Sequence, residues 1–349
     1  MPTLFDPLQL GDLTLPNRII MSPLTRCRAD AGRIPGALMA DYYAQRATAG
    51  LIISEAISVC PMGVGYPDTP GLWSQEQVEG WKIVTKAVHK AGGRIFAQLW
   101  HVGRVSAPLY LDDKLPEAPS AIKPAGHVSL VRPKQEYVTP RALETAEIPG
   151  IIEYYRKAAM NAQMADFDGV EIHGANGYLL DQFLQDSTNT RTDDYGGSLQ
   201  NRARLLLEVT DAAASVFGAE LVGMHLAPRC DAHDMGDSDP LATFSYVARE
   251  LREKGIAFIC AREHQGPDSI GPQLKKIFGG PYIANEGFTK ESAEAALAAG
   301  TADAVAWGQL FIANPDLVAR FAKNAALNPP DHTTFYAQGP QGYTDYPAL

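Results

Sequence analysis

A six-residue segment, His173-Gly-Ala-Asn176-Gly-Tyr178, carries side chains that can polarise an oxygen atom and deliver a proton beside it. It follows an apolar run, so its imidazole and carboxamide, three residues apart, can direct two N–H donors at one carbonyl or nitro oxygen. The phenol of Tyr178 is a weak acid that suits protonation of a carbanion as it forms. A plainer interpretation is that His173 and Tyr178 are core residues with satisfied polar atoms. The segment alone does not separate the two.

Polar side chains also follow other apolar runs. Most are amides, hydroxyls and imidazoles, at Thr25, Gln98, His101, His225, Asn285 and Gln309. Paired carboxylates are scarce among them, so the set fits a ligand held by many neutral hydrogen bonds better than a metal ion or a glycosidic bond. No second histidine lies at metal-ligand spacing from His101, and the four cysteines form no Cys-x-x-Cys pair. We therefore expect no bound metal and no disulfide framework.

The elements that must position these side chains are eight short apolar runs, each nearly continuous, as is typical of strands buried on both faces. They are Arg18–Pro23, Leu51–Ala56, Arg94–Trp100, Asp168–His173, Leu221–Leu226, Ile256–Cys260, Pro281–Asn285 and Asp303–Gly308. Amphipathic helical patterns lie between them, as in Ile148–Ala162 and Phe244–Lys254. Eight β-then-α units predict an α/β fold, a closed (β/α)8 or TIM barrel that forms one domain over residues 1–349. Active sites of this fold lie at the carboxyl ends of the strands.

Two segments fall outside the repeating pattern. Leu8–Leu15, with Gly11-Asp12 at its middle, predicts an N-terminal hairpin that closes the far end of the barrel. The interval from His101 to Ile148 is rich in Pro, Ser and Gly and too long for a simple loop. We expect it to be an excursion after strand three that covers the barrel mouth as a lid or substrate wall and contains a hairpin or short helices.

Composition excludes several partners. Of 349 residues, 46% are hydrophobic and 20% charged, which indicates a globular protein with a large core. The net charge is -10 without any block of Lys and Arg, so nucleic acid is not expected as a partner. No signal peptide begins the sequence and no apolar run approaches the roughly 18 residues that span a bilayer, so we expect no membrane partner and a cytoplasmic protein. Whether it is a monomer or a homodimer stays open.

Several segments, in order along the chain, resemble the Old Yellow Enzyme family of flavin-dependent ene-reductases. They include Pro23-Leu-Thr25-Arg26, Gln98-Leu-Trp100-His101, His173–Tyr178, Asp181-Gln-Phe-Leu184, Phe311-Ile-Ala-Asn314 and Gly342-Tyr343. The resemblance extends from about Leu4 to Leu349 and is greatest to the bacterial xenobiotic, nitrate-ester and morphinone reductases. It implies non-covalent FMN that is reduced by NADPH or NADH. An electrophilic small molecule then takes hydride from flavin N5 in the same pocket, in a ping-pong reaction.

The resemblance also assigns roles to single residues. It implies that Tyr178 is the proton donor and that His173 and Asn176 bind the activating oxygen of the substrate. The expected cofactor-binding residues are Pro23, Leu24, Thr25, Ala56, Gln98, His225, Asn285, Gly308 and Gln309. The expected substrate-binding residues are Trp100, His173, Asn176, Tyr178 and Tyr336.

Three positions depart from the family pattern. His225 stands where members commonly carry an Arg beside flavin N1 and O2, and Arg229 is a candidate to replace that charge. Gln309 stands where an Arg often meets the FMN phosphate, and loss of that contact costs on the order of 1–3 kcal/mol of binding. Ala107 replaces a common His and is expected to alter the loop wall.

Other function classes stay open at this point. A flavin barrel that oxidises its substrate, such as dihydroorotate or a 2-hydroxy acid, needs a base at the mouth together with an Arg clamp, which the His173–Tyr178 segment does not supply. A cofactor-free barrel, a metal-dependent barrel or a non-catalytic flavin-binding protein is a third class. The choice between NADPH and NADH is equally open, because no pair of residues that would read the ribose is evident.

Overall fold

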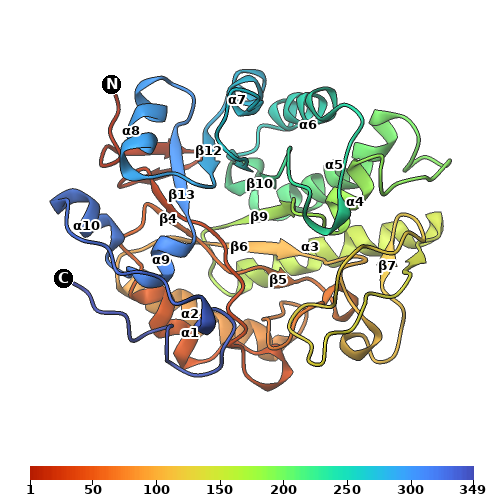
Figure 1. Ribbon diagram of the computed structural model, residues 1–349, viewed down its shortest axis with the longest axis horizontal. Helices are drawn as coiled ribbons and strands as arrows, with labels where there is room; N and C mark the ends of the chain where they lie inside the picture. Colours follow the sequence, from red (N-terminus) through yellow and green to blue (C-terminus); the bar gives the residue numbers. More distant parts are fainter.

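The computed structural model describes residues 1–349, and its centre is a closed barrel of eight parallel strands (Figure 1). The strands are β3 (Ile19–Met21), β4 (Leu51–Ile53), β6 (Ile95–Trp100), β9 (Gly169–Gly174), β10 (Val222–Leu226), β11 (Phe258–Arg262), β12 (Tyr282–Asn285) and β13 (Ala304–Trp307). Each pairs in parallel with the next, and pairing of β13 with β3 closes the ring. A short strand, β5 (Ile57–Ser58), adds to the end of β6. The (β/α)8 barrel predicted from the sequence is confirmed.

The strands form where the sequence has continuous apolar runs, because both of their faces are covered. Every residue of β6, β9 and β10 is buried, which is the pattern expected for a parallel barrel enclosed by helices. Most strand boundaries differ from the prediction by about one to three residues, and the shift of β11 is the one that bears on the site. Strand β11 begins at Phe258 rather than Ile256 and continues to Arg262, because its pairing with β12 extends two residues beyond the apolar run.

Helices surround the strands in Figure 1. They are α1 (Ala37–Ala44), α2 (Gln75–Lys90), α3 (Ile148–Met164), α4 (Leu179–Leu184), α5 (Leu199–Phe217), α6 (Pro240–Lys254), α7 (Gly271–Phe278), α8 (Lys290–Ala298), α9 (Gln309–Ala313) and α10 (Leu317–Lys323). Side chains cap the start of α2, α5 and α6, where Ser74, Ser198 and Asp239 accept from backbone N–H groups. Gly255 ends α6 in the left-handed conformation that favours glycine. No helix combines the length and hydropathy needed to cross a membrane.

The N-terminal hairpin closes the end of the barrel opposite the strands' carboxyl ends. Strands β1 (Leu8–Leu10) and β2 (Leu13–Leu15) pair antiparallel, and their buried leucines pack with Ile20, Phe96 and Phe258 from the barrel strands. The turn at Gly11 lies so close to the Glu220 carbonyl, just before β10, that a Cβ would collide with it at 1.8 Å. The predicted hairpin is confirmed.

The excursion after β6, residues 101–147, packs against the outside of one wall of the barrel opening. It contains 3-10 turns at Pro108–Tyr110 and Thr145–Glu147, and two short strands, β7 (Glu117–Ala118) and β8 (Arg141–Ala142). These strands pair in parallel, so they do not form a hairpin, although an antiparallel bridge joins His127 and Glu136. Its Val128 and Tyr137 pack in one apolar cluster with Trp100, against which Tyr178 also packs.

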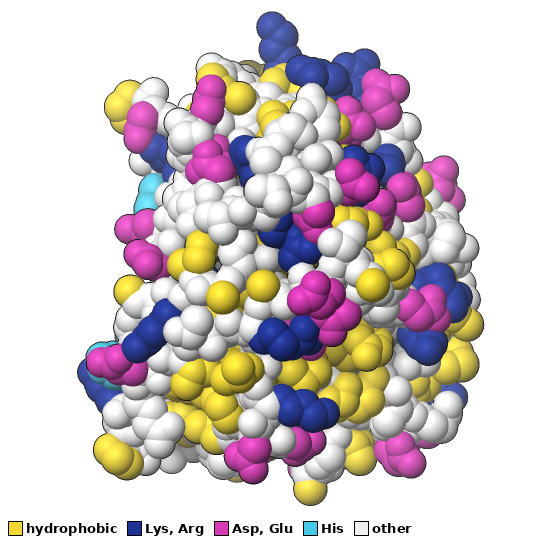
Figure 2. All heavy atoms as spheres, turned by 90° about the vertical axis from the view of Figure 1, so that its right-hand side faces the viewer, with side chains coloured by type: hydrophobic (Ala, Val, Ile, Leu, Met, Phe, Trp, Pro, Cys, Tyr) yellow, Lys and Arg dark blue, Asp and Glu magenta, His cyan; other side chains and the backbone are white.

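Charges on the face seen in Figure 2 are mixed. Lys and Arg side chains lie among Asp and Glu over this face, with no extended basic area, and hydrophobic side chains gather in its lower half.

Candidate active site

A cavity of about 670 Å³ opens at the carboxyl ends of the strands. Every cofactor-binding and substrate-binding residue predicted from the sequence lines it: Pro23, Leu24, Thr25, Ala56, Gln98, Trp100, His173, Asn176, Tyr178, His225, Asn285, Gly308, Gln309 and Tyr336. They come from strand ends and loops spread over the whole chain, which the closed barrel brings to one rim. No residue of the excursion 101–147 lines the cavity, so this segment supports the wall instead of forming it.

Two of these residues, Gln98 of β6 and His225 of β10, are buried and share a hydrogen bond. The amide nitrogen of Gln98 donates to Oε2 of Glu171 at 2.7 Å and lies 3.1 Å from Nδ1 of His225. The Gln98 amide oxygen and the ring nitrogen Nε2 of His225 are not taken by these bonds, and Nε2 is buried without a partner. An acceptor beside an orphaned ring nitrogen suits the uracil-like edge of a flavin, which alternates donors and acceptors.

One wall is an aromatic array built on β6 and β9. The rings of Trp100 and His173 are roughly parallel at 6.3 Å, and the Tyr178 ring stands perpendicular to both at 5.0 Å. The ring of His225 is stacked on the other side of His173 at 5.4 Å. This packing fixes the His173 ring without any hydrogen bond to its Nδ1, so its polar atoms remain for a ligand.

Asn176 is held in a strained conformation by its neighbours. Its φ of 58° lies in the left-handed region, which asparagine tolerates better than most residues. Its backbone carbonyl accepts from Nδ1 of His233 at 2.8 Å, and its side-chain oxygen accepts from Arg262 at 3.0 Å. Since the oxygen is engaged by Arg262, the amide NH2 group is the end left to donate to a ligand.

Tyr178 keeps its proton. Burial is the main cause that raises the pKa of its phenol well above 10, and the nearby Tyr66 adds to the effect. The two phenol oxygens are 2.8 Å apart and share a hydrogen bond. Burial also lowers the pKa of His173 well below 6.5, with His225 and Arg262 contributing. The pair therefore presents a protonated phenol and a neutral imidazole.

The far end of the cavity is lined by Asn285, Gly308, Gln309 and the loop around Gly287. The side chain of Asn285 donates to the Ala306 carbonyl at 2.8 Å and so ties β12 to β13. A Cβ on Gly308 would meet Leu24 at 2.9 Å, which keeps the backbone close to the ligand space. Gln309 is exposed at the rim.

Thirteen further residues line the cavity that were not predicted to bind cofactor or substrate, among them Tyr66, His233, Arg262 and Glu286. Arg262 is the only Lys or Arg on the cavity, and its guanidinium pairs with Glu286 at 3.0 Å. It was missed because the predicted strand ended at Cys260, before the position that faces the mouth. Tyr66 lies in a loop rich in glycine and proline, where no periodicity points to a site.

Arg229 does not replace the charge that His225 lacks. Its guanidinium pairs with Glu263 at 2.7 Å and with Asp268, and it does not line the cavity. Cys27 and His101 are buried away from the cavity as well. Nδ1 of His101 accepts from the Gly103 N–H, and burial lowers the pKa of His101 to about 3, which fits a structural role.

Comparisons with known proteins agree with this site. Residues 3–328 match the model of the NADH:flavin oxidoreductase / NADH oxidase family. The chain belongs to the Old Yellow Enzyme family. It is similar to the Old Yellow Enzyme homologue of Zymomonas mobilis, with 46% identity, full coverage of both chains and a TM-score of 0.97. Morphinone reductase in complex with tetrahydroNAD is 51% identical, with 100% and 98% of the chains covered and a TM-score of 0.97.

Plant members of the Old Yellow Enzyme family are similar too. The 12-oxophytodienoate reductase 1 of Oryza sativa subsp. japonica is 45% identical over 360 residues, which cover 99% of this chain and 93% of that protein. This chain is therefore an FMN-dependent oxidoreductase that uses NADH or NADPH as hydride donor. The orphaned His225 ring nitrogen and the Gln98 amide, described above, fit the flavin of an Old Yellow Enzyme.

Proposed function

We propose that the protein reduces the carbon–carbon double bond of activated alkenes, namely α,β-unsaturated carbonyl compounds and nitroalkenes, with nitrate esters and nitroaromatics as further electron acceptors. When bound, FMN would supply hydride transfer between NADPH or NADH and the second substrate in the same pocket. The residues of the chain hold the cofactor, polarise the substrate and provide a proton, and the two half-reactions alternate.

The observation that carries the proposal is the grouping of His173, Asn176 and Tyr178 on one wall of the cavity. The neutral imidazole and the free NH2 group of Asn176 donate to the carbonyl or nitro oxygen, which draws electron density from the double bond. The phenol of Tyr178, protonated because of its burial, gives a proton to the carbon that does not receive the hydride. A group with so high a pKa is a donor in this reaction and not a base.

The cofactor is proposed to lie across the floor. Gln98 and His225 would hold its uracil-like edge, Thr25 would donate to the O4 edge, and Ala56 would leave space for the ring system; all four line the cavity. Pro23 and Leu24 line the ring, while Asn285, Gly308 and Gln309 line the side of the phosphate. Trp100 and Tyr336 border the space left for the substrate. The whole chain, residues 1–349, is proposed to work as one FMN-binding barrel domain.

Relatives support the substrate class. Their names state that one acts on 12-oxophytodienoate and another on morphinone, both oxo compounds, and a structure of morphinone reductase holds a nicotinamide analogue. A small electrophilic molecule is accordingly proposed as the partner of this chain. The cavity, whose lining is mainly neutral, places few demands on the rest of such a molecule.

Anaerobic absorbance spectroscopy tests the function. The purified protein should be yellow, lose its colour when NADPH or NADH is added, and regain it on addition of 2-cyclohexen-1-one, with cyclohexanone as the product. Cyclohexanone itself, which lacks the double bond, is the control and should leave the protein colourless. Protein that bleaches but is not recoloured by any enone, nitroalkene, nitrate ester or nitroaromatic would contradict the proposal.

A further inference from the structure

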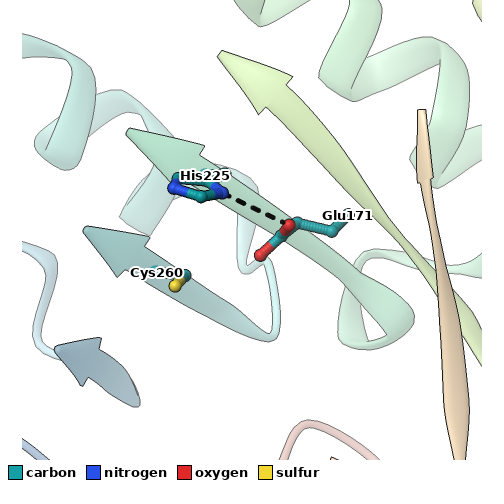
Figure 3. Close-up of side chains that lie close together, drawn as sticks. All are labelled: Glu171, His225 and Cys260. Atoms are coloured by element: carbon teal, nitrogen blue, oxygen red, sulfur yellow. Dashed lines mark ion pairs between the residues drawn. The ribbon is translucent and has the colours of Figure 1, made fainter. Parts of the chain in front are cut away.

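Glu171, His225 and Cys260 form a buried cluster below the floor of the cavity, contributed by the neighbouring strands β9, β10 and β11 (Figure 3). Their ligand atoms lie within 4.8 Å of one another. Hydrogen bonds, however, already use two of them. Oε2 of Glu171 accepts from the Gln98 amide, and Nδ1 of His225 lies 3.1 Å from the same nitrogen. The cluster is thus a hydrogen-bonded unit and not an open cage for an ion.

Glu171 is a carboxylate that the fold leaves with a single possible counter-charge. Its side chain is 0% exposed, one of its oxygens has no hydrogen-bond partner, and no Lys or Arg pairs with it. Its one ion-pair partner is His225, whose Nδ1 lies 3.6 Å from Oε2. A buried carboxylate is costly unless it is paired, and His225 is the group in position to pair with it.

His225 connects this carboxylate to the cofactor space. Its Nδ1 faces Glu171, while its Nε2 is the orphaned nitrogen at the floor of the cavity. In the neutral ring, Nδ1 accepts from Gln98 and Nε2 carries the hydrogen that a flavin oxygen or nitrogen can accept. A second proton can bind the ring only at Nδ1, which lies 3.6 Å from Oε2 of the Glu171 carboxylate.

We propose that His225, backed by Glu171, takes up a proton each time the bound cofactor is reduced and releases it when the cofactor is reoxidised. The hydride from NADH or NADPH brings two electrons and one proton, and so adds one negative charge above the floor. A proton from solvent then binds Nδ1 of His225 and neutralises this charge. On reoxidation the hydride leaves to the substrate and the imidazole proton returns to solvent. The inference rests on the proposed position of the flavin over Gln98 and His225.

Other titratable groups lie near His225. His173, stacked on it, has a pKa held well below 6.5 by burial, and burial likewise raises the pKa of the Cys260 thiol well above 9. Asp181 of α4 is a buried carboxyl whose pKa is raised to about 7, mainly by burial; its two oxygens accept from Gly177 and Gln185, and His225 is among the groups whose charge acts on it, so the test must distinguish the two residues. Arg262, the only cation lining the cavity, is paired with Glu286.

The test is the pH dependence of the two-electron midpoint potential of the FMN-loaded protein between pH 6 and pH 9, measured with no substrate present. Each proton taken up with two electrons changes the potential by about 30 mV per pH unit. Wild type should show a segment of about 60 mV per pH unit, for two protons. The variant H225R, with a permanent charge, and H225Q, which cannot titrate, should both show about 30 mV per pH unit throughout. The variant C260A is the matched control and should keep the wild-type slope.

E171Q locates the proton. It should move the two-proton segment to lower pH, because the imidazolium loses its partner. If E171Q abolishes the second proton while H225Q keeps it, the proton resides on the carboxylate, and the assignment to His225 is wrong. A two-proton slope in both H225Q and E171Q places the proton on another group, such as the cofactor or Asp181, and overturns the proposal equally.

Two further results keep the test decisive. A wild-type slope of one proton over the whole range overturns the proposal without any variant, even if H225R fails to fold or to retain FMN. A pH indicator in unbuffered solution should also report one more proton taken up by wild type than by H225Q on photoreduction. Failure of the protein to reduce alkenes would affect neither result, since no alkene is present.

Discussion

At the scale of single residues, the site depends on how neighbours fix the protonation and orientation of three side chains. Burial keeps Tyr178 protonated and His173 neutral, and Arg262 turns the amide of Asn176 so that its NH2 group faces the cavity. The two protonation states and the orientation of the amide are thus set by the protein itself. In the proposed reaction this amounts to electrostatic preorganisation of the site.

Replacement of Tyr178 by Phe should slow the oxidation of the reduced cofactor by 2-cyclohexen-1-one by roughly 10²–10⁴-fold, the usual contribution of a general acid. Reduction by NADPH or NADH should change little, because that step needs no proton from the phenol. Stopped-flow absorbance separates the two half-reactions. Y66F, which removes only the partner hydroxyl 2.8 Å away, is the matched control and should have a smaller effect. An equal loss in both half-reactions of Y178F would contradict the role of proton donor.

Replacement of Arg262 by Gln should raise KM for enones more than it lowers kcat. The guanidinium holds the Asn176 oxygen, so its loss frees the amide to rotate and weakens a charge-assisted contact of about 1.5–3 kcal/mol, or roughly ten- to a hundredfold. R262K should restore part of the effect. Steady-state kinetics measure both, and an unchanged KM in R262Q with a low kcat would show that Arg262 does not act through Asn176.

At the scale of elements, the sequence was most informative where burial is uniform. The eight strands were predictable because parallel barrel strands need continuous apolar runs, and the hairpin because Gly11-Asp12 separates two short leucine pairs. The end of β11 at Arg262 was not predictable, because its pairing with β12 continues to the polar residues Arg262 and Asn285. The pairing of β7 with β8 inside the excursion was also not predictable, since strands of two residues are too short to show any periodicity.

The residues of the site were predictable for the same reason. Once the strands were placed, their carboxyl ends gave the rim of the cavity. Contacts between side chains from distant elements could not be predicted, because no local sequence pattern encodes them. Examples are Tyr66 with Tyr178 and Arg262 with Asn176.

The hairpin can be tested as an element. Leu10 is fully buried against the barrel interior, so L10A should lower the free energy of unfolding by roughly 2–5 kcal/mol. The exposed Thr14 is a control on the same hairpin, and T14A should stay within about 0.5 kcal/mol of wild type. Urea unfolding measures both. If L10A cost no more than T14A, the hairpin would not be part of the core.

At the scale of the whole molecule, the negative net charge of the protein disfavours binding of the anionic FMN. The chain carries a net charge of -10, and its cavity has one cation, Arg262, which is already paired with Glu286. FMN is an anion, and with no unpaired cation on the cavity its phosphate would have to be held by neutral donors and backbone N–H groups. We therefore expect weaker cofactor retention than an additional cation at the rim would give.

The variant Q309R should supply that cation. Gln309 is exposed at the rim of the cavity, and a guanidinium there can form a charge-assisted contact with the phosphate of about 1.5–3 kcal/mol. The Kd of FMN, measured by quenching of its fluorescence on titration with apoprotein, should fall roughly ten- to a hundredfold. Q309L is the neutral control, and equal affinities of Q309R and Q309L would show that the phosphate does not lie at this end.

The most direct test of the account concerns the double variant H173A/N176A, loaded with FMN and reduced by dithionite so that no nicotinamide is needed. Loss of one preorganised donor slows such reactions by about 10²–10³-fold. Recolouring by 2-cyclohexen-1-one, followed by stopped-flow absorbance, should therefore slow by at least this much, while recolouring by dioxygen should proceed at the wild-type rate. Recolouring by the enone as fast as in wild type would contradict the claim that these two donors activate the substrate above the flavin.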